Sequence, residues 1–187
     1  MFGTINRLLL LISLVLIPCV FTSDAAAFLP PSLPQWVIMR EYDERTYISG
    51  EDIRTVLKNG RLRCSSANGA VCCETTPEWT VADAFVTDID RDGDDEVILL
   101  VWKIGSFGRY KPFWREDEPD RELTEHIFIF DWDSTRSDPL VPKWMSSDIK
   151  IKAQDVFPDE ARRIHIITPS GDETVWAWES WGLSLYG

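Results

Sequence analysis

Residues 86–97 read V-T-D-I-D-R-D-G-D-D-E-V, and the expected fold of the chain is built outward from this stretch. Acidic residues stand at every second position, a glycine follows the third of them, and a glutamate stands three residues after the glycine. A hard cation such as Ca²⁺ takes roughly six to eight oxygen ligands in a flexible cage, and this spacing can supply them. The sequence therefore predicts a Ca²⁺ site formed by Asp88, Asp90, Asp92, the backbone carbonyl of Asp94, and Glu96.

The residues on either side of this loop favour strands over helices. Ala84–Val86 and Val97–Trp102 are apolar runs rich in β-branched residues. An EF-hand would need flanking helices and a glutamate at its twelfth position, where this sequence has Leu99. The alternative is an acidic hairpin turn that binds nothing. We favour the cation site, because carboxylates this closely spaced repel one another unless a cation neutralises them.

The loop and the strand before it resemble the calcium loops of FG-GAP or VCBS-type repeats in integrin-α-like β-propellers. The matching residues are the run Trp79–Asp88, followed by Asp90, Asp92, Gly93 and Glu96. The close match covers little more than this segment, and Glu96 stands where such loops more often carry an aspartate. The resemblance implies antiparallel sheets like propeller blades, bound Ca²⁺, and a role as an interaction module outside the cytosol.

The N-terminal segment has the layout of a secretory signal peptide. A single basic residue, Arg7, precedes an apolar run from Leu8 to Phe21, and three alanines end the segment at Ala27. The apolar run is short for a membrane span, which needs roughly 20 residues. We therefore expect cleavage after Ala27 and a secreted or cell-envelope protein without a transmembrane segment in the mature chain. Attachment of a lipid at Cys19 stays open.

The rest of the chain is long enough for one domain with a real core. We expect a proline-rich linker over residues 28–35 and a single β domain over residues 36–187. The net charge of −12 belongs to this mature part, since the leader carries one Arg and one Asp. Such a charge repels nucleic acid. The expected partner is another extracytoplasmic protein or a surface polymer.

The fold class expected from the sequence is mainly β, with one short N-terminal helix. The helix is predicted between a cap at Ser49 and a stop at Asn59-Gly60. Strands are predicted at 36–39, 61–64, 84–86, 96–103, 126–132 and 140–145. A weaker second copy of the pattern follows at 152–156, 162–167, 174–179 and 182–186. The two copies indicate about two blade-like sheets, arranged as a partial propeller or a sandwich or completed by a partner.

Three cysteines remain after the expected cleavage. In an oxidising compartment Cys64 could pair with Cys72 or Cys73 across a short loop, which would leave one thiol over. The choice between the two partners stays open at this stage.

The sequence contains no motif for an enzyme active site. A nucleophile elbow, a zincin helix and a phosphate-binding loop are all missing, and neither His126 nor His165 has a nucleophile close by in sequence. The nine tryptophans fit core packing better than a binding platform, with Trp114 the best candidate for an exposed contact. We therefore expect a non-catalytic protein. The alternative is a secreted hydrolase or a carbohydrate-active or carbohydrate-binding protein whose acids converge only in the folded chain.

Overall fold

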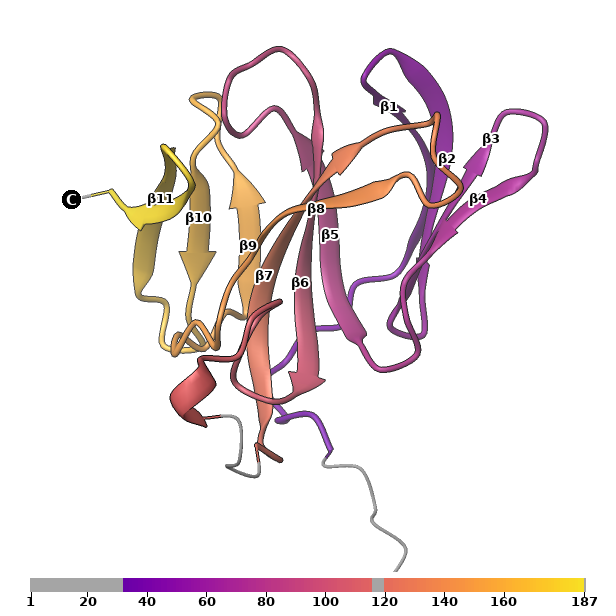
Figure 1. Cartoon of the computed structure of the whole chain (residues 1–187). Coiled ribbons are helices and arrows are strands. Elements are labelled where there is room, and N and C mark those ends of the chain that lie inside the picture. The colour runs from indigo at the N-terminus through magenta and orange to yellow at the C-terminus, as the bar shows by residue number, and fades with distance from the viewer. Residues whose placement is uncertain (1–31, 116–119, 187) are drawn as a thin grey trace, which may run out of the picture. The chain divides into compact units, whose positions relative to one another are not determined.

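The computed structural model describes residues 32–115 and 120–186, and this part of the protein is mainly β (Figure 1). It contains three four-stranded antiparallel sheets, in each of which the strands lie side by side in chain order. Every connection within a sheet therefore joins neighbouring antiparallel strands. The expected signal peptide, residues 1–27, lies outside the described residues.

The three sheets follow one another along the chain. The N-terminal sheet contains β1 (Tyr42–Ile48), β2 (Glu51–Lys58), β3 (Arg61–Ser66) and β4 (Val71–Glu74). The middle sheet contains β5 (Thr80–Thr87), β6 (Glu96–Ile104), β7 (Leu123–Trp132) and β8 (Leu140–Met145). The C-terminal sheet contains β9 (Asp155–Pro158), β10 (Ile164–Ile167), β11 (Glu173–Glu179) and β12 (Gly182–Leu185). The short 3₁₀ helix η1 (Phe113–Arg115) lies between β6 and β7.

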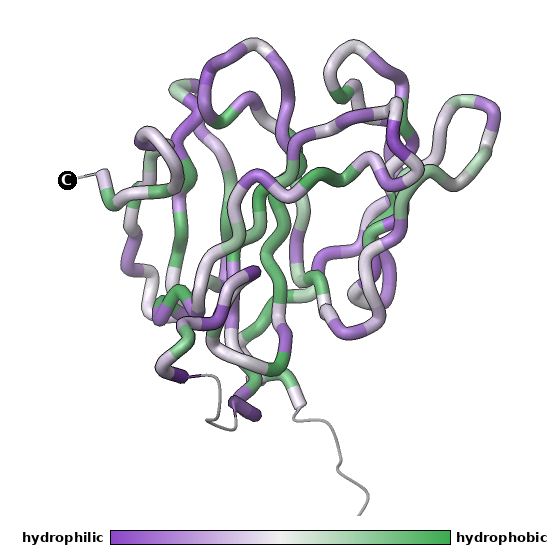
Figure 2. Tube along the Cα trace, viewed as in Figure 1, coloured by the Kyte–Doolittle hydropathy of each residue, from purple (hydrophilic) through white to green (hydrophobic). Residues whose placement is uncertain are grey.

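The middle sheet is covered on both faces, which explains its unbroken apolar strands. Along β6, Val97 and Leu99 pack into a first core shared with the N-terminal sheet. The alternate residues Ile98 and Leu100 pack into a second core shared with the C-terminal sheet. Successive side chains of a strand point to opposite faces, so a strand buried on both sides must be apolar throughout. Figure 2 shows this as a continuous hydrophobic band through the centre, with hydrophilic loops at the ends.

The segment before β1 also contributes to the packing. Leu33 and Trp36 both pack against the second core, and Trp36 meets Trp102 edge-on with the ring centroids 5.6 Å apart. Part of the expected linker therefore lies on the body of the protein. Among the described residues, no helix is long and apolar enough to cross a membrane.

The short N-terminal helix predicted between Ser49 and Gly60 is wrong, because these residues form β2 and its two turns. Ser49-Gly50 and Asn59-Gly60 all have positive φ, from 48° to 81°. Two consecutive residues with positive φ make the type I′ turn that closes a two-residue hairpin. The two signals interpreted as the start and stop of a helix are the hairpin turns at the two ends of one strand.

The number of sheets also differs from the prediction. The two sequence copies correspond to the middle and C-terminal sheets, whose strands β5–β8 and β9–β12 follow the same order. The N-terminal sheet is a third unit of the same kind, from a region in which a helix and isolated strands were expected. The described part of the chain thus contains three such sheets instead of about two.

Cys64, Cys72 and Cys73 are free thiols in the structure, so the disulfide expected at Cys64 is not formed there. Cys64 on β3 lies directly opposite Cys73 on β4, and both are buried. A hydrogen bond with Cys64, together with burial, raises the pKa of the Cys73 thiol. Of the two expected partners, Cys73 is therefore the one that faces Cys64.

Gly108, in the connection between β6 and β7, has no room for a side chain. A Cβ atom there would overlap the backbone carbonyl oxygens of Met145 and Ser146 at the end of β8. Backbone atoms cannot rotate away as a flexible side chain can, so the connection itself would have to shift. We expect Gly108→Ala to lower the free energy of unfolding by about 1–3 kcal/mol, the usual cost of overpacking. Urea denaturation followed by tryptophan fluorescence would measure the loss, and an unchanged midpoint would contradict the tight contact.

Candidate metal centre

The acidic loop connects β5 to β6 at one end of the middle sheet (Figure 1). Arg91 and Gly93 have φ of 65° and 102°, which turns the chain back on itself within a few residues. Asp88, Asp90 and Glu96 then converge, with one oxygen from each within 4.8 Å of the others. The predicted strands on either side of the loop are confirmed, and the loop gathers three of the five expected ligand residues.

Backbone N–H groups of the loop fix one oxygen of each carboxylate. The N–H of Gly93 donates to Asp88 Oδ2 (3.2 Å), and the N–H of Asp92 donates to Asp90 Oδ1 (3.3 Å). The N–H of Ile89 donates to Glu96 Oε2 (2.8 Å). Each of these three side chains is therefore held by the loop itself while its other oxygen is left for a cation.

The centre is largely closed off from solvent at two of its acids. Asp88 is 6% exposed and Glu96 only 1% exposed. Burial raises the pKa of Glu96, while Lys143 and the N–H of Ile89 act in the opposite direction. Burying a carboxylate costs much free energy unless a cation or several hydrogen-bond donors compensate its charge. The buried carboxylates of this centre therefore need positive charge nearby.

Two basic side chains from other parts of the fold supply such compensation. The Nζ atom of Lys143, on β8, lies 2.6 Å from Asp90 Oδ2 and 2.7 Å from Glu96 Oε1. The Nη1 atom of Arg162, in the turn between β9 and β10, lies 2.5 Å from Asp88 Oδ2. Burial would lower the pKa of Lys143, but its hydrogen bonds to the carboxylates outweigh this and hold the pKa above its ordinary value. Sequence analysis missed both residues.

One carboxylate oxygen remains uncompensated. Among the described residues, Asp88 Oδ1 is buried and has no hydrogen-bond partner. An unpartnered polar atom in the interior costs free energy, and native structures contain few of them. A divalent cation held between Asp88, Asp90 and Glu96 would give this oxygen a ligand bond. The donor set consists only of carboxylate oxygens, which suits a hard cation such as Ca²⁺.

The other two predicted ligands lie at the rim of the centre. Asp92 is exposed, and its Oδ2 atom lies 3.9 Å from the Lys143 ammonium. The Asp94 side chain is exposed as well, and its N–H donates to Asp92 Oδ1 (3.0 Å). The predicted role of the Asp94 carbonyl as a ligand stays a prediction.

The two histidines are engaged in hydrogen bonds of their own. His126 is fully buried, with Nδ1 3.0 Å from the carbonyl oxygen of Ser146 and Nε2 2.9 Å from Thr124 Oγ1. His165, on the C-terminal sheet, has its ring nitrogens next to Asp159 and Glu173, which raise its pKa. Neither belongs to the acidic cluster.

Most of the tryptophans pack in the interior, as expected from the sequence. Seven of them pack in or against the two cores: Trp36, Trp79, Trp102, Trp132, Trp144, Trp176 and Trp178. The exposed aromatic side chains Tyr110, Phe113 and Trp114 gather instead in the connection between β6 and β7. This connection is therefore the main aromatic surface of the middle sheet.

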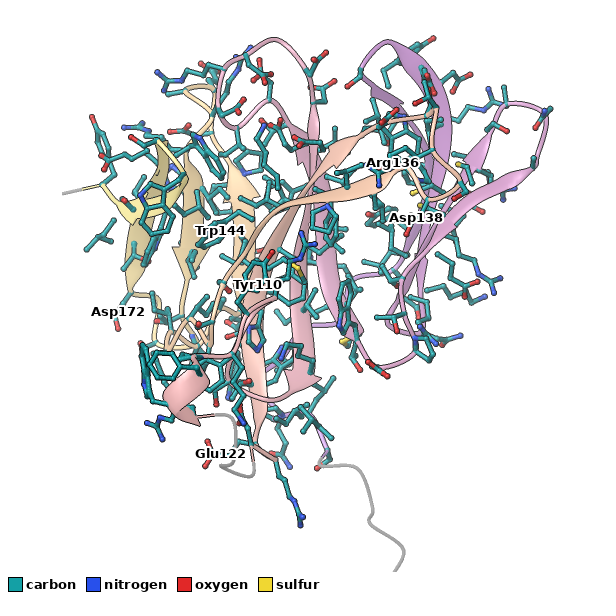
Figure 3. The ribbon with its side chains drawn as sticks, viewed as in Figure 1. Tyr110, Glu122, Arg136, Asp138, Trp144 and Asp172 are labelled. Atoms are coloured by element: carbon teal, nitrogen blue, oxygen red, sulfur yellow. The ribbon has the colours of Figure 1, made fainter. Side chains whose placement is uncertain are left out.

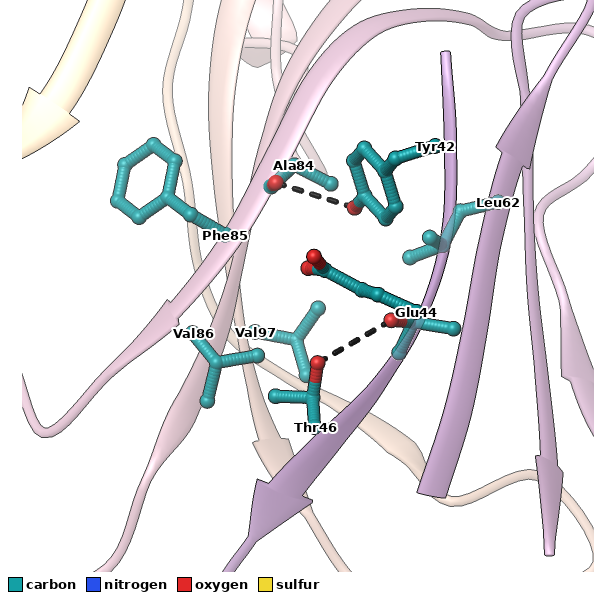
Figure 4. Close-up of a pocket in the computed structure, with 9 residues that line it drawn as sticks. Tyr42, Glu44, Thr46, Leu62, Ala84, Phe85, Val86 and Val97 are labelled. Carbon is teal, nitrogen blue, oxygen red and sulfur yellow. Dashed lines mark hydrogen bonds between the residues drawn. The ribbon is translucent and has the colours of Figure 1, made fainter.

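Two cavities among the described residues are lined partly by carboxylates. One of about 260 Å³ lies between β1 and β5, where the Tyr42 hydroxyl donates to the carbonyl oxygen of Ala84 (3.1 Å) and Glu44 points inward (Figure 4). Glu44 is the one carboxylate that lines it. Another, of about 270 Å³, is lined by Trp36, Trp102 and several charged residues, including Glu125. The acidic loop lines neither of these two cavities.

No protein-family model, curated protein or solved structure matches the chain, so its function has to be inferred from this geometry.

Proposed function

We propose that the protein is a non-catalytic, extracytoplasmic β-repeat module that binds Ca²⁺ through the loop between β5 and β6. The observation that carries this proposal is the buried, unpartnered Oδ1 atom of Asp88, a residue that converges with Asp90 and Glu96. Loop N–H groups already orient these carboxylates, so binding would require little reordering of the chain. The role of the ion is structural: it neutralises a group of converging acids, one of which, Asp88, also pairs with Arg162 of the C-terminal sheet.

We further propose that the three sheets are propeller-like blades of FG-GAP or VCBS type. Their strands follow one another in chain order, and the middle sheet is covered on both faces, as expected for consecutive blades. Three blades are fewer than the roughly four to eight of a closed ring. An incomplete ring leaves sheet surfaces that a partner can cover. We therefore propose that the module contacts an extracytoplasmic protein or a surface polymer, with Tyr110, Phe113 and Trp114 as exposed contact residues.

The proposal predicts that Ca²⁺ raises the melting temperature of the desalted protein. Extracellular modules bind Ca²⁺ with dissociation constants of roughly 10⁻⁴ to 10⁻³ M. At ten times such a constant, binding adds about 1.4 kcal/mol to the free energy of unfolding. For a protein of this size that corresponds to a shift of about 3–6 °C. Asp88→Asn should remove most of the shift, because it takes away the charge of the buried ligand.

The matched control is Asp172→Asn. Asp172 lies in the turn between β10 and β11, at the end of the C-terminal sheet opposite to the acidic loop (Figures 1 and 3). This variant should keep the full response to Ca²⁺. Mg²⁺ should substitute poorly, since it demands tighter octahedral geometry. Identical melting curves in Ca²⁺, Mg²⁺ and chelator would show that the loop is only an acidic turn.

A further inference from the structure

The Lys143 ammonium lies among the oxygens that a divalent cation would use. It contacts Asp90 Oδ2 at 2.6 Å and Glu96 Oε1 at 2.7 Å, and Asp92 Oδ2 lies 3.9 Å away. These are oxygens that the loop N–H groups leave available, because Asp92 and Ile89 donate to the other oxygens of Asp90 and Glu96. Two cations cannot share these oxygens at close range, since like charges a few ångströms apart repel strongly.

Lys143 neutralises the cluster only in part. Its single positive charge faces Asp90 and Glu96, while Arg162 takes Asp88 Oδ2. Asp88 Oδ1 keeps no partner among the described residues. A divalent ion would bring twice the charge of the ammonium and would reach this remaining oxygen as well. The lysine thus fills part of the site without completing it.

The lysine also has partners outside the loop. Its Nζ atom lies 3.0 Å from Asp131 Oδ1, on the neighbouring strand β7, and 5.7 Å from the centre of the Trp178 ring on β11. The Asp131 side chain is 46% exposed, so it has open space around it. An aromatic face within about 6 Å attracts a cation. The ammonium therefore has an ion-pair partner and an aromatic face to retain after leaving the loop.

We propose that Lys143 is a resident counter-cation that a divalent ion displaces from the loop, and that the ammonium then stays with Asp131 and Trp178. This inference rests on the proposed Ca²⁺ site and adds the competition that sets its affinity. Lys143 keeps the acidic loop folded when no metal is bound. It also lowers the affinity for Ca²⁺, because every binding event must first break two ion pairs.

The first test replaces Lys143 with methionine, which keeps the unbranched shape and most of the length of the side chain and removes its charge. Calorimetric titration with Ca²⁺ should give a dissociation constant at least ~10-fold lower than in the wild type, because the competing charge is gone. Without metal the variant should melt at a lower temperature than the wild type, and saturating Ca²⁺ should remove this difference. Lys150→Met is the control: Lys150 is exposed and pairs with Asp148, outside the loop, so the dissociation constant should stay unchanged.

The second test keeps Lys143 and removes its partner outside the loop. Asp131→Asn should weaken Ca²⁺ binding several-fold in the wild type, because the displaced ammonium loses its ion pair. In the Lys143→Met background the same change should have no effect. If Asp131 were itself a Ca²⁺ ligand, its loss would weaken binding in both backgrounds. The double-mutant cycle thus separates competition by Lys143 from ligation by Asp131. If Lys143→Met folds poorly, Lys143→Gln can replace it in the cycle.

The outcomes distinguish the inference from the proposed function. Equal dissociation constants in wild type and Lys143→Met would overturn the competition and leave the Ca²⁺ site standing. Binding in Lys143→Met alone would support the competition and show that in the wild type the lysine replaces the metal. Absence of binding in both proteins would overturn the inference together with the Ca²⁺ site.

Discussion

Replacing Phe128 with alanine should lower the free energy of unfolding by about 3–5 kcal/mol, the largest effect of any single core truncation expected here. Phe128 is the largest side chain among the fully buried ones and lies on β7, in the first core. Its ring meets the Trp79 ring edge-on, with the centroids 5.0 Å apart. The truncation would therefore leave a cavity between the N-terminal and middle sheets and also remove an aromatic pair.

Urea denaturation at constant pH and Ca²⁺ concentration would measure this loss. Phe113→Ala makes the same chemical change on a side chain that is 77% exposed, so its free energy of unfolding should stay within about 0.5 kcal/mol of the wild type. If Phe128→Ala were as mild as Phe113→Ala, the two sheets would not share a close-packed core at this point.

The strands of the middle sheet could be predicted closely from the sequence. The expected strands 96–103 and 126–132 lie within β6 and β7, and the expected strand 140–145 coincides with β8. Both faces of β6 and β7 are buried, so their apolar runs are continuous and flanked by polar loops. The C-terminal sheet was recognisable through the same order of strands, although its own strands are shorter.

The sequence carries the signals of the N-terminal sheet, but some of them also fit a helix. Ile53, Thr55 and Leu57 are buried on one face of β2, which is the period of a strand. The helical interpretation used Ile53, Val56 and Leu57, whose spacing also fits one face of a helix. The threonine at position 55 hid the alternation, because it is polar by type but buried in the fold.

The candidate metal centre was predictable only on its acidic side. Asp88, Asp90 and Glu96 lie within nine residues of one another, so their spacing alone indicates that they can converge. Lys143 and Arg162 are 47 and 74 residues away from the carboxylates they contact. They reach the loop through the pairing of β8 with β7 and the packing of the C-terminal sheet. Local spacing carries no information on such partners.

The second large effect expected is a loss of stability as the pH rises, caused by Glu125. This residue lies on β7 opposite Trp102 and is 4% exposed. Its Oε2 atom accepts the N–H of Ala153 (3.0 Å), while Oε1 is buried without a partner among the described residues. Burial, reinforced by the charge of Asp148, raises the pKa of Glu125 to about 8 against the opposing effect of the Ala153 N–H.

The sign of the effect follows from which state holds the proton. In the unfolded chain Glu125 ionises near its ordinary pKa of 4.5, whereas in the folded protein it keeps its proton up to a pH of about 8. Its contribution to stability is thus fully present below pH 4.5 and is lost as the pH rises to about 8. Across this window the loss amounts to about 1.4 kcal/mol per pH unit. Asp83, whose pKa burial raises to about 6, acts in the same direction over the lower part of the window.

Glu125→Gln separates this group from all others, because glutamine resembles the protonated acid and can still accept the Ala153 N–H. We expect the wild type to lose several kcal/mol of unfolding free energy between pH 5 and pH 8, and the variant to lose much less. Denaturation in urea at both pH values, with Ca²⁺ held constant, would measure the difference. The control is the same substitution at the exposed Glu122, three residues earlier. Glu122→Gln should keep the pH dependence of the wild type, which would show that the loss of an exposed carboxylate does not change it. A pH dependence that is the same in wild type and Glu125→Gln would mean that Glu125 is already ionised in the folded protein and that its environment stabilises the charge.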